Sequence, residues 1–150
     1  MAPKMDARVT KAWNTFKFQI LVDPSVKYSG YFDAKGQLIT LNANQVTSFP
    51  DTIYHELGHF LAFIAGNVDT KADFKAIYTA EKGKLTGVSA AYAKQSSSEF
   101  FAECTRLYVV DNANLKKTCP KTYAAIQKAL DSVTDTRIKL LQKTYGAYWK

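Results

Sequence analysis

The sequence predicts an α+β domain in which a small, mostly antiparallel sheet packs on helices. Short runs of aromatic and β-branched residues, typical of strands, occur only between residues 16 and 41. Apolar residues spaced three and four apart, typical of helices, dominate the rest of the chain. The 150 residues are 47% hydrophobic, which is enough for one core, and no repeat or linker divides them. We therefore expect residues 1–150 to form a single domain.

Three strands are expected near the N-terminus, after one short helix. The strand segments are 16–22, 26–32 and 37–41. The residues from Asp33 to Gly36 form a turn, so the second and third strands are expected to make a hairpin. A helix over 6–14 precedes the strands, because Val9 and Trp13 lie four residues apart.

Helices are expected in the remaining part of the chain. Their expected ranges are 48–65, 69–80, 99–110 and 120–145. Ser48 and Asp51 resemble a capping box, and Ser96 stands just before the third of these helices. Pro120 opens the last helix, at a position where its missing amide donor costs nothing.

Charge and composition narrow the classes of partner. The formal net charge is +7, which favours an acidic partner or substrate. The basic residues are scattered and no nucleic-acid-binding motif is present, so no nucleic-acid partner is expected. No apolar run approaches the ~20 residues of a membrane span, and the N-terminus lacks the apolar core of a signal peptide. The two cysteines, Cys104 and Cys119, form either one disulfide or two buried free thiols, and the sequence leaves this open.

The two histidines of the chain stand four residues apart in the segment His55-Glu56-Leu57-Gly58-His59. On a helix this spacing directs both imidazoles to the same side, where they can bind one metal ion. Glu56 lies beside them and can reach a water on the metal without being a ligand. The H-E-x-x-H pattern therefore predicts a zinc site with Glu56 as general base. The alternative is a pair of helix histidines satisfied by ordinary hydrogen bonds.

A third zinc ligand must come from a carboxylate, because catalytic zinc takes three protein ligands and no histidine remains. Ala62 and Ala65 exclude the extended H-x-x-G-x-x-H pattern. Glu81 falls in a lysine-rich stretch, so we expect it to be solvated. Glu99 and Glu103 lie four residues apart on an otherwise apolar helix, where buried carboxylates need a cation.

Glu99 and Glu103 can have different roles at the metal site. One carboxylate binds the metal, and the other accepts the free N–H of a ligating histidine. The residues alone do not decide which does which. An ion pair with Arg106 or a lysine is the alternative role for Glu103.

Around these residues the chain resembles the catalytic domain of anthrax-toxin lethal factor and its relatives, which include the Pro-Pro endopeptidases. The HELGH segment and the segment 92–103, YAKQSSSEFFAE, carry the resemblance, which extends roughly from Gln37 to Leu130. It implies a zincin-like fold, one zinc ion and secretion. It also implies that Glu99 is the third ligand, which leaves Glu103 to support a ligating histidine. Tyr92, seven residues before Glu99, would be a catalytic tyrosine.

The function predicted from these features is that of a zinc-dependent endopeptidase. Glu56 acts as general base, while Tyr92 and zinc stabilise the oxyanion. The strand with Leu38, Ile39 and Thr40 is expected to be the sheet edge to which an extended peptide adds. We expect a monomer that acts on a peptide or protein. The alternative from another class is a non-catalytic lethal-factor-like module that binds a partner protein.

Overall fold

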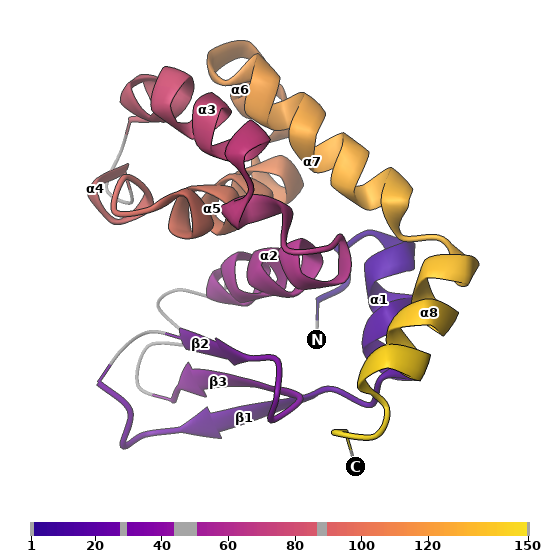
Figure 1. Ribbon diagram of the computed structural model, residues 1–150. Coiled ribbons are helices and arrows are strands. Elements are labelled where there is room, and N and C mark those ends of the chain that lie inside the picture. The colour runs from indigo at the N-terminus through magenta and orange to yellow at the C-terminus, as the bar shows by residue number, and fades with distance from the viewer. Residues whose placement is uncertain (1, 28–29, 44–50, 87–89, 150) are drawn as a thin grey trace.

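In the computed structural model of the protein, residues 2–27, 30–43, 51–86 and 90–149 are described (Figure 1). Their elements confirm the predicted α+β class. In chain order these are α1 (Ala7–Thr15), β1 (Gln19–Asp23), β2 (Gly30–Asp33), β3 (Leu38–Asn42), α2 (Thr52–Ile64), α3 (Ala72–Glu81), α4 (Ala90–Ala93), α5 (Ser97–Val110), α6 (Asn112–Thr118), α7 (Pro120–Ser132) and α8 (Asp135–Tyr145). Short 3-10 helices precede and follow α3, over Val68–Thr70 and Lys82–Lys84. Within the described residues, no helix has both the length and the apolar character to cross a membrane.

Helix α2 lies at the centre of the fold. Figure 1 shows it between the sheet and α5, with α3, α6 and α7 beyond α5 and with α1 and α8 at one end. Phe60 of α2 is fully buried, and its ring contacts those of Trp13 and Phe18, with centroids 5.1 and 4.9 Å away. Cys104 and Cys119 are both buried free thiols. One aromatic and aliphatic core thus joins both faces of α2.

The sheet is mixed, so the prediction of a mostly antiparallel sheet was wrong. Its strand order is β1-β3-β2, in which β3 pairs antiparallel with β2 and parallel with β1. The predicted hairpin of β2 and β3 is confirmed. The chain reverses direction once between β1 and β2 and again in the hairpin, so β1 and β3 run the same way. This arrangement places β3 in the middle, with a neighbour on each side.

Helix α2 matches its predicted range closely. Its N-cap is Asp51, whose side chain makes no capping hydrogen bond within the described part of the chain. Ser48 and Pro50, the other parts of the predicted start signal, lie outside the described residues. The helix ends where Gly66 and Asn67 take positive φ values of 93° and 59°.

The C-terminal helices differ from the prediction in two ways. Helix α6 was not expected, and the predicted helix 120–145 is two helices. Between them, Thr134 takes extended backbone angles and its hydroxyl accepts a hydrogen bond from the Arg137 amide at 3.1 Å. A threonine cap therefore starts α8 as a separate helix that packs at the end of α2.

Candidate metal centre

Helices α2 and α5 carry the predicted metal ligands and pack closely against each other. Gly58 of α2 makes this approach possible, because a Cβ there would lie 2.7 Å from the Cα of Ala102. The role of Gly58 was not predicted. A glycine inside a helix lowers helix stability by about 1 kcal/mol relative to alanine. Its presence in a predicted helix is therefore a signal that another group approaches the backbone closely.

Two imidazoles and one carboxylate converge at this helix contact. His55 Nε2 lies 3.0 Å from Glu99 Oε2, and His59 Nε2 lies 3.4 Å from Glu99 Oε1. One ligand atom from each of the three residues lies within 4.8 Å of the others. The side chain of His55 is 7% exposed, whereas those of His59 and Glu99 are 17% and 24% exposed. The cluster therefore has a buried end at His55 and a more open end at His59.

This donor set fits a zinc ion. Tetrahedral zinc with bonds of ~2.0–2.1 Å holds its donor atoms roughly 3.3–3.4 Å apart, close to the separations between the imidazole nitrogens and Glu99. Two histidines and one glutamate are also the ligands of one class of catalytic zinc site, which keeps a fourth position for water. Among the described residues, this is the group of histidine and acidic side chains with metal-binding geometry.

Glu103 contacts the ring nitrogen of His55 that does not face Glu99. Its Oε1 lies 3.1 Å from His55 Nδ1, and Arg106 donates to its two oxygens from Nε and Nη2 at 2.9 and 2.8 Å. The two roles offered as alternatives for Glu103 thus occur together. A carboxylate so placed accepts a hydrogen bond from Nδ1–H and leaves His55 Nε2 facing Glu99.

The electrostatics of the cluster favour a cation. Burial opposes a charge on His55, but hydrogen bonds to Glu103 and Glu99 outweigh it and raise its pKa to about 9. Burial also acts to raise the pKa of Glu99, but hydrogen bonds from His55 and His59 hold it well below its usual value. Without a metal, a proton on His55 therefore supplies positive charge beside the carboxylates.

Glu56 lies next to His55 and is almost fully buried, at 3% exposure. Burial raises the pKa of its carboxyl group above the ordinary value. Strand β2 passes directly over it, since a Cβ on Gly30 would lie 2.8 Å from Glu56 Oε1. Gly30 was not singled out from the sequence, although a glycine inside a strand signals the close approach of another group.

The predicted substrate strand is placed differently from the expectation. Leu38, Ile39 and Thr40 belong to β3, and each of them pairs with one residue of β1 and one residue of β2. A peptide cannot add to a strand that already has two neighbours, so the prediction of β3 as the sheet edge was wrong. Ile39 is fully buried in the core. The strand beside Glu56 is β2, which is at an edge of the described sheet.

Tyr92 belongs to α4, and its side chain lies outside the described part of the structure. The backbone of this segment is held next to α5, because Ala93 is fully buried and the Tyr78 hydroxyl donates to the Lys94 carbonyl.

Two further hydrogen bonds fix the start of α5. The Ser96 hydroxyl accepts from the Glu99 amide, as its predicted cap position requires, and the Ser98 hydroxyl donates to Asp69 at 2.7 Å.

Glu81 was expected to be solvated, and this was wrong. It is 1% exposed, and its Oε1 accepts hydrogen bonds of 2.7 Å from both the amide and the hydroxyl of Thr122. Its Oε2 accepts from the Lys121 amide at 3.1 Å. The carboxylate caps the N-terminus of α7, where a helix provides free amides and a positive dipole end.

Comparison with known families identifies the family of the chain. The chain matches the family described as "Anthrax toxin lethal factor, N- and C-terminal domain" over residues 35–129, which is more than half of its length. It belongs to this lethal-factor family. The matched range includes α2, α5 and the whole metal cluster. Because the description covers both an N-terminal and a C-terminal domain, membership gives the family and not the reaction. No curated protein matches the chain.

Proposed function

We propose that this lethal-factor family member is a zinc-dependent endopeptidase with a zincin-like fold. His55, His59 and Glu99 hold the zinc ion. The observation that carries the proposal is the convergence of their ligand atoms within 4.8 Å at the contact of α2 with α5. The buried Glu56 beside that cluster makes it a reactive site, because a purely structural zinc site has four protein ligands and needs no base.

The residues around the metal divide the chemistry of peptide hydrolysis. A zinc ion bound there supplies a Lewis acid and lowers the pKa of its water. Glu56, whose pKa is raised by burial, accepts the proton of the attacking water and delivers it to the leaving amine. Glu103 keeps His55 in the orientation and tautomer that a metal ligand requires. The phenol of Tyr92 donates a hydrogen bond to the developing oxyanion.

The substrate is an extended peptide that adds along β2. Support comes from Gly30, which brings the backbone of β2 against the Glu56 carboxylate. Main-chain hydrogen bonds to an edge strand hold a peptide of any sequence in register, while side-chain pockets select it. The net charge of +7 favours acidic residues near the cleaved bond. We propose a monomer that acts outside the cell, in keeping with a family named after a toxin.

The test is cleavage of a random peptide library by zinc-loaded protein, with mass spectrometry of the products. Wild type is expected to cut it, whereas Glu56→Gln is expected to lose roughly 10²- to 10⁴-fold in kcat/KM with its zinc retained. Glu81→Gln is the matched control, since it makes the same change at a buried glutamate whose carboxylate bonds to α7 and not to the metal cluster, and it should cut normally.

Each outcome has a definite meaning. Cleavage by wild type and by Glu81→Gln, but not by Glu56→Gln, would establish the role of Glu56. Bound zinc without cleavage by any of the three proteins would instead favour a non-catalytic module that binds a partner. Equal cleavage by Glu56→Gln and wild type would show that another residue is the base.

A further inference from the structure

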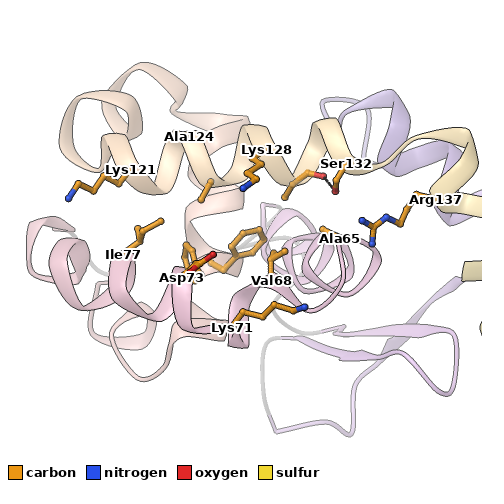
Figure 2. A pocket seen from close by; sticks show the side chains of 14 residues that line it. Ala65, Val68, Lys71, Asp73, Ile77, Lys121, Ala124, Lys128, Ser132 and Arg137 are labelled. Carbon is orange, nitrogen blue, oxygen red and sulfur yellow. Dashed lines mark hydrogen bonds between the residues drawn. The ribbon is translucent and has the colours of Figure 1, made fainter. Parts of the chain in front are cut away.

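A hollow in the surface lies between α3 and α7, and none of the residues proposed for catalysis lines it (Figure 2). Its volume is about 550 Å³, within the ~300–1,000 Å³ typical of small-molecule sites. None of the proposed zinc ligands or catalytic residues lines it. We refer to it as the α3–α7 groove.

The floor of the α3–α7 groove is apolar. Phe74 of α3 and Phe101 of α5 meet there edge to face, with ring centroids 5.1 Å apart. Ile77 extends this floor along α3. The opposing wall on α7 is built from small side chains, namely Ala124, Ala125 and Ala129. Alanines opposite aromatic rings leave the space that makes the groove.

The rim of the α3–α7 groove is cationic. Its charged lining residues are the four cations Lys71, Lys121, Lys128 and Arg137 and the single acid Asp73. Figure 2 shows Lys121 and Arg137 toward the two ends of the groove, with Lys128 between them. Within the described residues, none of these four cations has a carboxylate within ion-pair distance, unlike Arg8, Lys11 and Arg106 elsewhere on the surface. The lining thus carries a net positive charge, four cations against one acid, and none of the four cations is in an ion pair among the described residues.

We propose that the α3–α7 groove binds a small anionic amphiphile, with its apolar body on Phe74 and Phe101 and its anionic head at Lys128. Burial of an aliphatic chain gains roughly 0.8 kcal/mol for each CH₂ group removed from water. An extended peptide fits this lining less well, because its backbone amides would need partners that the rings and alanines do not offer. Charge-assisted hydrogen bonds from a lysine to a carboxylate head complete the match.

The experiment is calorimetric titration of the zinc-loaded protein at pH 8 with laurate and, separately, with dodecanol, which has the same chain but no charge. Laurate is expected to bind at one site and at least about tenfold more tightly than dodecanol, because only laurate can form a charge-assisted hydrogen bond. Lys128→Gln is expected to remove most of that difference. Ala125→Leu, which fills the groove from α7, is expected to weaken both ligands. Lys75→Gln, on the exposed side of α3 and not part of the lining, is the matched control and should bind as wild type.

Several results would overturn the proposal. These are the absence of saturable binding of laurate, equal affinity for laurate and dodecanol, or undiminished laurate binding by a folded Ala125→Leu variant. The last result would place the carboxylate elsewhere, for example on the zinc ion. Thermal unfolding of each variant shows whether it is folded, and Ala125→Ser replaces Ala125→Leu if the leucine variant is not, with a smaller loss of affinity expected.

Discussion

Of the three glutamates that the protein buries almost completely, Glu81 and Glu103 lie outside the proposed reacting groups and have different partners. Glu103 is 3% exposed and Glu81 is 1% exposed, and each accepts hydrogen bonds at both carboxylate oxygens. The partners of Glu103 are the side chains of His55 and Arg106, whereas those of Glu81 come from the first turn of α7. His55 has a second nitrogen that faces Glu99, so we expect Glu103 to influence the proposed metal cluster through His55. Glu81 contacts only a helix end, so we expect it to contribute to stability. Burial of a carboxylate therefore does not identify a functional group, and the atoms it contacts do.

Among variants that leave the proposed zinc ligands and Glu56 themselves unchanged, the largest effect on catalysis is expected from Gly30→Ala. The new methyl group would lie 2.8 Å from Glu56 Oε1 and force the carboxylate to move, without contact with a metal ligand. A displacement of about 1 Å in a reacting group can cost on the order of 10²-fold in rate, so kcat/KM should fall by about that much with zinc content unchanged. Gly83→Ala is the control, because nothing lies within 4 Å of a Cβ at that position. Peptide cleavage by Gly30→Ala at the wild-type rate would contradict the placement of Glu56.

Glu103→Gln tests whether the carboxylate at His55 Nδ1 supports the proposed metal site. Loss of the charged acceptor at His55 Nδ1 is expected to weaken zinc binding or activity by roughly 10- to 100-fold. Competition with a zinc chelator measures the affinity, and Glu81→Gln in the same assay should be unchanged. If both variants lost zinc to the same degree, the distinction between the two glutamates would be wrong.

Glu81→Gln is expected to reduce the free energy of unfolding by about 1–2 kcal/mol, because the amide group turns one acceptor into a donor against the helix amides. Urea unfolding of the zinc-loaded protein measures this loss. An unchanged unfolding midpoint would show that the contact with α7 contributes nothing to stability.

The sequence predicted the helices that carry the site better than it predicted their surroundings. The positions of His55 and His59 follow from their spacing on α2, and the helix that carries Glu99 follows from its cap at Ser96, both of which are local patterns. The choice of Glu99 over Glu103 as ligand came from the family resemblance and not from a local pattern. The environment of Glu81 depends on Thr122, forty-one positions further along the chain, and no local pattern reports such a contact.

The position of β3 was missed for a similar reason. Strand order depends on where the chain crosses between β1 and β2, and alternation within one strand carries no information about its neighbours. The contribution of Gly30 depends on the same topology, because β2 must lie at the edge beside α2 for its backbone to reach Glu56.

The most direct test of the central claim is the zinc content of three proteins after dialysis against a weak chelator. Elemental analysis should give one zinc per chain for wild type and for Glu81→Gln, and a large loss for Glu99→Ala, which removes one of three ligands. Absence of zinc from wild type, or full retention by Glu99→Ala, would contradict the metal centre at the contact of α2 with α5.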